Sequence, residues 1–416
     1  MVIPALHEGD NLRRLLPELA STLRDLNLSY EVLVVSVSDD TATSQAAESN
    51  GARFLAQRRP GYGGALVRGF EEATGEYILT MDGDLSHSAG FVQTLWQARR
   101  EAEVSIASRY VPGGQAKMSR YRYMLSWVAN WFFGKGLDVP IRDLSSGFRL
   151  YRSSVIAAQR ISANDFDILQ QLIVQAYIEG WHVQELPFTY EPRVHGHSHA
   201  RVLRVGLAYL KQFGRLWMVR NSILAADYDD RAHDSRIVLQ RYWQRARHRF
   251  VTELFHGEGA VLDVGCGSSR IIGDLPPGSV AVDVLLRKLR YARRFGKPLV
   301  HGSGFALPFA DAAFPCVLCS QVIEHVPKTS PILDELCRVL RPGGRLVLGT
   351  PDYANWQWVL MERLYGLVPG GYADEHIAHY THDELLRIME ARGFVYEDER
   401  YIMRGELIMA FRKKDR

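Results

Sequence analysis

The chain has 416 residues and a formal net charge of +3, with 47% apolar and 23% charged residues. These values indicate a globular protein of two or three domains and exclude disordered, collagen-like and disulfide-stapled chains. The four cysteines form no framework spread over the chain, so a reducing compartment is expected. No apolar run approaches about 18 residues and no signal peptide is evident, so we expect a protein that neither spans a membrane nor is exported.

Short apolar runs alternate with helical periods from the first residue to about residue 110, which predicts parallel strands joined by crossover helices. The first strand ends at Pro4, and because it starts at the second residue we expect residues to be missing upstream of Met1. The later strands are predicted at residues 31–36, 53–56, 77–81 and 104–107, with helices at 11–26, 43–50, 64–73 and 89–100.

A polar stretch at residues 227–234 has no apolar period and predicts a domain boundary between residues 226 and 236. A second α/β series follows, with strands predicted at residues 260–264, 280–284, 298–301, 315–320 and 345–350. The chain is therefore expected to form two α/β domains, residues 1–225 and residues 236–416, with no repeat between them.

Two carboxylates, Asp82 and Asp84, follow directly after the predicted strand that contains Thr80. Side chains two residues apart at a strand end point the same way and can together hold a hard cation such as Mg²⁺ or Mn²⁺. Such a cation can bridge the diphosphate of a nucleotide-sugar. The same Asp-x-Asp pattern also occurs in solvated turns, so its setting in the chain decides its meaning.

Five segments set this pair in a wider pattern, and they follow one another along the first half of the chain. They are residues 2–12 (VIPALHEGDNL), 59–65 (RPGYGGA), 82–87 (DGDLSH), 108–114 (SRYVPGG) and 143–152 (DLSSGFRLYR). Together they resemble the family 2 glycosyltransferases, and within them the dolichyl-phosphate mannosyltransferase-like group. The resemblance implies a nucleotide-diphospho-sugar transferase fold. The residues it implies for the donor are Pro4, Ala5 and Glu8 at the nucleoside, and Asp82 and Asp84 at the metal and diphosphate.

The same resemblance implies an acceptor, because Arg109, Arg122 and Ser126 match positions that bind the phosphate of a polyprenyl phosphate. A phosphate is already anionic near neutral pH, so it needs cationic donors to position it and no general base. The resemblance also implies inverting transfer, and we expect Asp84, Arg109 and Arg122 to be the catalytic residues.

The loop after the second predicted strand departs from the family pattern. Ser36 and Val37 stand where the family has two aspartates, and Thr41 replaces a later one. Asp39 or Asp40 is expected to contact the base instead, and we name Asp39. The identities of the base and of the sugar stay open.

Residues 202–224 place apolar side chains and basic residues at helical spacing. This predicts an amphipathic helix that lies on the anionic cytoplasmic face of a membrane, while the alternative is a helix packed on its own domain with a solvated basic face. Just upstream, His195, His197 and His199 either add charge at acidic pH or lie in a solvated loop. A nucleic-acid partner is not expected, because the aromatic residues share the apolar side and no binding motif occurs.

In the second half, Asp263 lies on a predicted strand that opens into a glycine turn. Gly265 and Gly267 in this turn let the backbone approach a ligand closely. Asp283 ends the next strand, where a carboxylate can accept both hydroxyls of a ribose. Arg270 stands at the third glycine position of the dinucleotide-binding pattern, which disfavours a dinucleotide.

These residues, followed in order by residues 307–314, 324–326 and 341–345, resemble the class I S-adenosylmethionine-dependent methyltransferases, which have a Rossmann-like fold. The cofactor residues that the resemblance implies are Asp263, Gly265 and Gly267 at the methionine part, Asp283 at the ribose, and Ser303, Gly304 and Phe305 at the adenine. On the acceptor side, His376 or His379 could take a proton from a hydroxyl, and we name His379. Equally, residues 379–381 could cap a helix predicted at residues 382–392, and His325 is expected to be structural.

We therefore expect an enzyme with two transferase activities. One is metal-dependent transfer of a sugar from a nucleotide-sugar to a polyprenyl phosphate at the membrane face, and the other is methylation of a small molecule, lipid or glycan precursor by S-adenosyl-L-methionine. The alternatives are a saccharide or other hydroxyl as the sugar acceptor, a non-catalytic nucleotide-sugar-binding module, and a methyltransferase domain that serves only as a scaffold. The number of chains in the assembly stays open.

Overall fold

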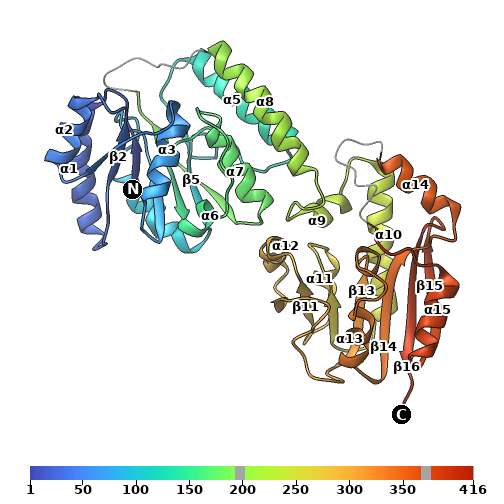
Figure 1. Ribbon diagram of the computed structural model, residues 1–416. Helices are drawn as coiled ribbons and strands as arrows, with labels where there is room; N and C mark the ends of the chain where they lie inside the picture. The colour runs from blue at the N-terminus through green and yellow to red at the C-terminus, as the bar shows by residue number, and fades with distance from the viewer. Residues whose placement is uncertain (193–201, 367–375, 416) are drawn as a thin grey trace. The chain divides into compact units, whose positions relative to one another are not determined.

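The computed structural model describes residues 1–192, 202–366 and 376–415, and for residues 202–209 and 364–366 it describes the backbone alone. The chain divides into two compact units, Met1–Arg220 and Asn221–Arg416. Figure 1 shows the first in blue to green and the second in yellow to red. Each unit has its own seven-stranded sheet, which confirms the α/β class predicted for both halves.

The first sheet has the strand order β3-β2-β1-β4-β7-β5-β8. Its strands are β1 (Val2–Pro4), β2 (Leu33–Ser36), β3 (Arg53–Ala56), β4 (Tyr77–Thr80), β5 (Val104–Ser108), β7 (Arg149–Arg152) and β8 (Val183–Pro187), while β6 (Gln115–Ala116) pairs separately with β9 (Thr189–Tyr190). The helices are α1 (Gly9–Asp25), α2 (Thr41–Ser49), α3 (Gly61–Glu72), α4 (Phe91–Gln97), α5 (Arg120–Gly136), α6 (Ser153–Ala157), α7 (Ile168–Ile178) and α8 (Val202–Arg220). All five strands predicted before residue 110 are present, and the helix predicted at residues 89–100 ends in a 3₁₀ turn from Ala98 to Arg100.

Parallel pairing brings the predicted donor residues to one edge of this sheet. Strand β1 pairs in parallel with β2 and with β4, and Val2 and Ile3 are fully buried. Because parallel strands end at the same edge, the segments after Pro4, Ser36 and Thr80 come together there. The fold thus positions the site that the sequence distributes over the first 85 residues.

Arg149 on β7 is buried and links three segments of the chain through hydrogen bonds. Its guanidinium donates hydrogen bonds to the carbonyl oxygens of Leu169 and Leu144, both at 2.8 Å, and to the Tyr151 hydroxyl at 3.1 Å. We expect Arg149→Met to lower the free energy of unfolding of this unit by about 2 kcal/mol, because two buried carbonyls lose their donor. Arg152→Met, at the exposed end of the same strand, should change it by less than about 0.5 kcal/mol. Hydrogen exchange of the β7 amides measures both, and equal losses in the two variants would contradict the role of Arg149.

The second sheet has the order β12-β11-β10-β13-β14-β16-β15. Its strands are β10 (Val261–Val264), β11 (Val280–Asp283), β12 (Leu299–His301), β13 (Phe314–Ser320), β14 (Leu340–Pro351), β15 (Phe394–Ile402) and β16 (Glu406–Lys413). The helices are α9 (Tyr228–His233), α10 (Val238–Phe255), α11 (Ile271–Asp274), α12 (Leu286–Ala292), α13 (Ile332–Val339), α14 (Trp356–Gly366) and α15 (His382–Ala391). Strand β16 alone runs antiparallel to its neighbours β14 and β15, and β10 to β14 form the parallel core of a Rossmann-like sheet, as predicted.

The boundary between the units lies earlier than the sequence suggested. Residues 227–234, expected to be a linker, contain helix α9 of the second unit. The Asp229 carboxylate accepts hydrogen bonds from the Ser268 amide at 3.0 Å and from Lys288 Nζ at 2.8 Å, and Asp230 pairs with Arg270. The polar residues lack an apolar period because they form ion pairs with Lys288 of helix α12 and with Arg270, both in their own unit.

Candidate functional sites

The first unit contains a cavity of about 150 Å³ beside the sheet edge described above. It is lined by Asp82, His87, Arg109, Ser145, Ser146, Gly147, Phe188 and Tyr190. Two predicted site residues, one from the donor set and one from the acceptor set, therefore share one cavity.

Asp82 is held in a defined orientation at this cavity. The Tyr62 hydroxyl donates a hydrogen bond to Asp82 Oδ1 at 2.9 Å, and burial together with the charge of Asp82 raises the pKa of Tyr62. The Asp82 amide donates to Nδ1 of the buried His87 at 3.0 Å, whose ring stacks on Phe148 with the ring centroids 4.8 Å apart. A fixed carboxylate is a hard oxygen ligand, so the residue fits Mg²⁺ or Mn²⁺.

Asp84 has different surroundings from Asp82. It is 3% exposed, and its Oδ1 accepts hydrogen bonds from the amide and the hydroxyl of Ser86. Leu85 between them has a φ of 63°, so the segment turns sharply. Asp84 therefore shapes the loop and is absent from the residues that line the cavity. Its role as a second metal ligand stays a prediction.

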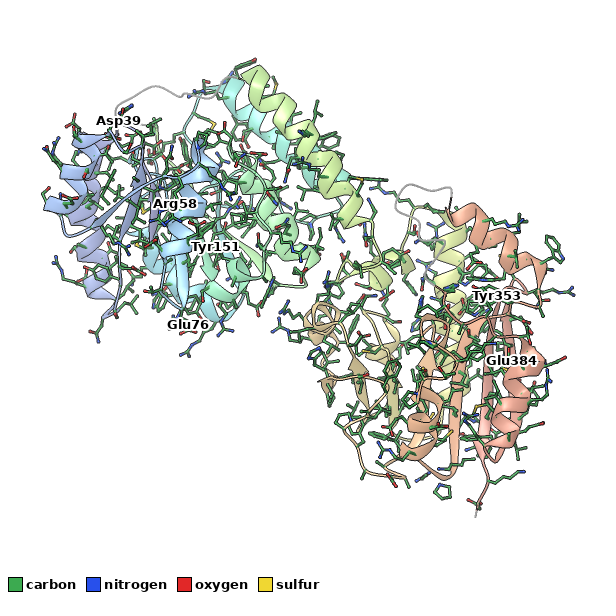
Figure 2. All side chains as sticks on the ribbon, viewed as in Figure 1. Asp39, Arg58, Glu76, Tyr151, Tyr353 and Glu384 are labelled. Carbon is green, nitrogen blue, oxygen red and sulfur yellow. The ribbon has the colours of Figure 1, made fainter. Side chains whose placement is uncertain are left out.

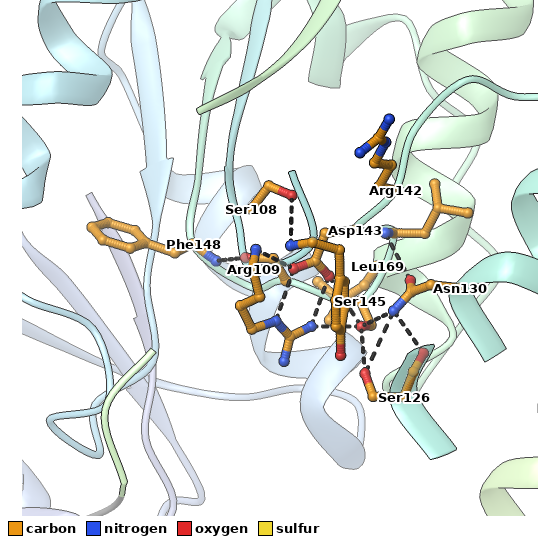
Figure 3. A network of polar contacts seen from close by, with 12 residues as sticks. Ser108, Arg109, Ser126, Asn130, Arg142, Asp143, Ser145, Phe148 and Leu169 are labelled. Carbon is orange, nitrogen blue, oxygen red and sulfur yellow. Dashed lines mark hydrogen bonds and ion pairs between the residues drawn. The ribbon is translucent and has the colours of Figure 1, made fainter. Parts of the chain in front are cut away.

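A buried carboxylate holds the Arg109 guanidinium in place (Figure 3). Its Nε donates to Asp143 Oδ2 at 2.8 Å and its Nη2 to Asp143 Oδ1 at 2.7 Å. Asp143 is fully buried; burial acts to raise its pKa, but the pairing with Arg109 outweighs this and lowers the pKa. The guanidinium thus has a fixed plane, and its Nη1 has no hydrogen-bond partner among the described residues.

Ser145 connects the Arg109–Asp143 pair to helix α5. Its hydroxyl accepts from Arg109 Nη2 at 2.7 Å and from Asn130 Nδ2 at 2.9 Å, and lies 3.4 Å from the Ser126 hydroxyl. The network in Figure 3 therefore brings Ser126 together with Arg109, as the acceptor prediction requires. Arg122 lies one turn before Ser126 on the same helical face; it is exposed, and its side chain forms no hydrogen bond or ion pair with the described residues.

The residues predicted to bind the nucleotide-sugar donor at the end of β1 lie beside the loop that follows β2. Pro4 and Ala5 are buried, and the Glu8 amide donates to Thr43 Oγ1 at 3.1 Å. Asp40 is occupied by the loop itself, because its Oδ2 accepts from the His7 amide at 2.8 Å and from the Ser36 hydroxyl at 2.7 Å. Asp39 is exposed (Figure 2), so of the two aspartates it is the one available to a nucleoside.

The second unit contains a cavity of about 420 Å³. All seven predicted cofactor residues line it: Asp263, Gly265, Gly267, Asp283, Ser303, Gly304 and Phe305. This volume is in the range of pockets that enclose a small molecule or cofactor. Residues from segments 40 positions apart therefore face one space.

The turn after β10 requires its glycines. Gly265 and Gly267 have φ values of +75° and +57°, and a Cβ on Gly265 would lie 2.2 Å from the Val322 side chain. Asp283 holds the turn, because its Oδ2 accepts from the Gly267 amide at 2.8 Å while its Oδ1 accepts from the Leu285 amide at 2.7 Å. Burial, and then the charge of Asp283, raises the pKa of Asp263 to about 7. A close backbone approach with a carboxylate beside it fits a nucleoside ligand.

The structure changes the order of the histidine candidates. His325 lines the cavity, whereas His379 does not and stacks on Tyr353 with ring centroids 4.0 Å apart. Thr381 caps helix α15 by accepting a hydrogen bond from the Glu384 amide at 3.3 Å, so the capping alternative is confirmed for this residue. His325, which was expected to be structural, is thus the histidine that lines this cavity. His195, His197 and His199 lie outside the described residues.

A family model described as glycosyl transferase family 2 matches residues 1–158, and one described as a methyltransferase domain matches residues 262–348. The chain therefore joins a family 2 glycosyltransferase to a methyltransferase. The methyltransferase domain implies S-adenosylmethionine as its cofactor. Helix α8 and the residues up to Arg220 extend the glycosyltransferase unit beyond its matched segment.

Three curated relatives match one half each. A dolichol-phosphate mannosyltransferase of Pyrococcus furiosus is 29% identical over 226 residues, 52% of this chain and 62% of that protein. An undecaprenyl-phosphate mannosyltransferase of Micrococcus luteus is 29% identical over 210 residues, 47% of this chain and 85% of that protein. A candidate methyltransferase of Encephalitozoon cuniculi is 32% identical over 158 residues, 37% of this chain and 72% of that protein. The chain thus spans less than two thirds of the Pyrococcus relative.

Several residues that line the methyltransferase cavity were not predicted from the sequence. Asp229, Gln244, Arg247 and Lys288 line it from helices α9, α10 and α12. No motif marks them, because they lie outside the strand-to-turn segments that carry the family pattern. The sequence signal that could have pointed to these residues was the basic residues of helix α10. One of them, Arg247, forms a bidentate ion pair at 2.6 Å with the buried Glu406.

Proposed function

We propose that the glycosyltransferase half transfers a sugar, with inversion, from a nucleotide-sugar to the phosphate of a polyprenyl phosphate. The observation that carries this proposal is the Arg109–Asp143–Ser145–Ser126 network beside Asp82. A guanidinium held in one plane by a buried carboxylate suits a phosphate, because its Nη1 can donate a charge-assisted hydrogen bond from a fixed position. The names of the two mannosyltransferase relatives support a lipid phosphate as the acceptor.

Within this proposal each residue has a separate task. Arg109 and Arg122 bind and orient the acceptor phosphate, and no residue has to remove a proton from it. Asp82, oriented by Tyr62 and His87, faces the diphosphate side of the cavity. A bound Mg²⁺ or Mn²⁺ would supply positive charge to the diphosphate of the donor. Asp39, which is exposed, contacts the nucleoside in this proposal, and the sugar stays open.

A peripheral membrane contact is part of this proposal. Helix α5 exposes an unusual amount of apolar surface, and α8 lies beside it (Figure 1), with Phe132 and Phe213 packed at a centroid distance of 4.6 Å. The exposed apolar residues of the two helices are Tyr121, Tyr123, Met124, Leu125, Trp127, Val128, Trp131, Phe132, Leu210, Met218 and Val219. Neither helix contains an acidic residue, while Arg120, Lys135, Lys211 and Arg215 are exposed. Aromatic residues with cationic neighbours favour an anionic bilayer surface.

This apolar surface carries the acceptor residues, because Arg122 and Ser126 belong to helix α5 itself. A lipid with its chains in the bilayer would present its phosphate at this helix. All four cysteines are free thiols, which is usual in a reducing compartment and supports the cytoplasmic face. No helix in the described parts of the chain is long and apolar enough to cross a bilayer.

Replacing Trp127 and Trp131 by glutamate should weaken binding to anionic vesicles by at least about tenfold, because two interfacial aromatics become charged. Both side chains are about half exposed, so the fold should be retained. Sedimentation with vesicles of phosphatidylcholine and phosphatidylglycerol measures the change. Tyr30→Glu, at an exposed aromatic residue elsewhere in the unit, is the control. Equal binding by the double variant and the native chain would contradict the membrane contact at α5.

For the methyltransferase half we propose methylation of a small molecule, lipid or glycan precursor. S-adenosylmethionine, when bound, supplies a methyl group on a positively charged sulfur. In this proposal the glycine turn after β10 gives it backbone contact, and Asp283 accepts the ribose hydroxyls in addition to the two backbone amides that it already holds. Phe305, which is 43% exposed at the cavity, offers an aromatic face to the adenine.

The test of the glycosyltransferase proposal is transfer of radiolabelled sugar from a panel of nucleotide-sugars to a polyprenyl phosphate in detergent. Labelled lipid should form with one donor and disappear when a chelator removes divalent cations. Parallel reactions with saccharide acceptors distinguish a hydroxyl acceptor. Labelling of the saccharide alone, or no labelling with any donor by a folded protein, would overturn the proposal.

A further inference from the structure

Three potential metal ligands of the methyltransferase half lie together outside the predicted cofactor residues. Glu324 and His325 belong to the 3₁₀ turn Ile323–His325 after β13, and His376 lies in the segment before α15. One ligand atom from each lies within 4.8 Å of the others. The Glu324 carbonyl accepts hydrogen bonds from the amides of Ile377 and Ala378 at 2.8 Å and 3.0 Å, which holds the two segments against each other.

Glu324 provides an independent observation. It is fully buried, and neither of its carboxylate oxygens forms a hydrogen bond with a described residue. Isolated carboxylates are costly to bury, and buried charges are usually paired or coordinate metals. The carboxylate of Glu324 faces the two imidazoles, so a cation between the three groups would compensate its burial.

His376 is oriented in the way that metal-binding histidines usually are. Its Nδ1 lies 2.7 Å from the Tyr353 hydroxyl and 3.1 Å from Glu362 Oε1. A carboxylate on one ring nitrogen sets the tautomer and leaves the other nitrogen for the metal. The His325 ring lies 5.0 Å from that of His376, between centroids, and lines the cofactor cavity. The cluster therefore opens onto the cavity through His325.

We propose that Glu324, His325 and His376 bind one divalent transition-metal ion at the edge of the cofactor cavity. Two imidazole nitrogens and one carboxylate oxygen suit Zn²⁺, Co²⁺, Fe²⁺ or Mn²⁺. Ligand atoms around one such ion lie about 3 to 4 Å apart, so small side-chain adjustments close the set.

The ion also indicates the class of methyl acceptor, an inference that rests on the proposed methyltransferase function. Three protein ligands leave a coordination position for a further oxygen, as in catalytic metal sites. Binding to a divalent metal lowers the pKa of a hydroxyl. The site would therefore favour an acceptor with a hydroxyl group, and His379 would not be needed as a base.

The test measures the metal alone, so its outcome does not depend on methyl transfer. The untagged full-length chain is stripped with a chelator and titrated with Co²⁺, whose visible absorption reports nitrogen and oxygen ligands. We expect one equivalent whose affinity falls by at least about tenfold in His376→Ala and in Glu324→Gln. His256→Ala, an exposed histidine outside the cluster, should bind this equivalent as the native chain does.

Glu324→Gln preserves the shape of the side chain, so it covers the case in which His376→Ala fails to fold. The carboxylates Asp82 and Asp84 are unchanged in all three variants, so metal bound by the glycosyltransferase half does not affect the difference. Equal Co²⁺ titrations of the native chain, Glu324→Gln and His376→Ala would overturn the proposal. Binding of S-adenosylhomocysteine, measured separately, tests the methyltransferase assignment itself.

Discussion

Replacing Arg109 by alanine should reduce kcat/KM for a polyprenyl phosphate acceptor by about 100-fold or more, the loss typical when a fixed donor to a reacting oxyanion is removed. The reason lies in its geometry: both Nε and Nη2 are held by Asp143 at 2.8 Å and 2.7 Å, so the guanidinium needs no reorganisation to meet a phosphate. Transfer of radiolabelled sugar at several lipid concentrations measures the change. Affinity for the nucleotide-sugar, measured by calorimetry, should be unchanged.

Variants of two further arginines, one as a second test and one as a control, make this prediction specific to the acceptor site. Arg109→Ala leaves Asp143 buried without its partner, which can destabilise a protein, so Arg122→Ala is the second variant. The Arg122 side chain is exposed and forms no hydrogen bond or ion pair with the described residues; its loss should cost about tenfold in activity and nothing in stability. Arg142→Ala is the matched control, because this exposed residue lies in the same loop as Asp143 and points away from the network (Figure 3). Full activity of Arg122→Ala with lipid would argue for a different acceptor.

Asp283→Ala should weaken binding of S-adenosylmethionine by about 100-fold, because hydrogen bonds to a charged group contribute about 1.5–3 kcal/mol each. The Asp283 carboxylate accepts from the amides of Gly267 and Leu285, so its loss loosens the turn as well as removing the predicted ribose contact. Titration calorimetry with S-adenosylmethionine and S-adenosylhomocysteine measures the effect.

Asp283→Asn separates these two contributions. The amide retains one acceptor oxygen but turns a donor toward one backbone amide, so its affinity should lie between those of the native chain and the alanine variant. Asp334→Ala, at an exposed carboxylate that contacts Arg392, should bind the cofactor normally. Native affinity in Asp283→Ala would show that the cavity binds its ligand without this residue.

Most of the strands and helices could be predicted from local sequence patterns. Buried strands such as β1 and β10 are apolar runs bounded by turns, and the glycines after β10 stand at positive φ values that other residues rarely adopt. The expected strand of residues 53–56 coincides with β3. Helix α4 ends at Gln97, earlier than expected, where the chain continues in a 3₁₀ turn. Helix α9 was expected to be a linker because a short helix held by ion pairs leaves no apolar period.

Local patterns were enough to predict the two families, the strand ends that carry Asp82, Asp263 and Asp283, and the glycine turn. Which polar groups meet depends on the folded arrangement. Arg109 and Asp143 are 34 positions apart, Glu324 and His376 come from separate segments, and the exposure of Trp127 and Trp131 depends on what packs against α5. Such contacts form when distant segments are brought together by burial of the sheets, so no local spacing or propensity encodes them. The choice of His325 over His379 at the cavity has the same origin.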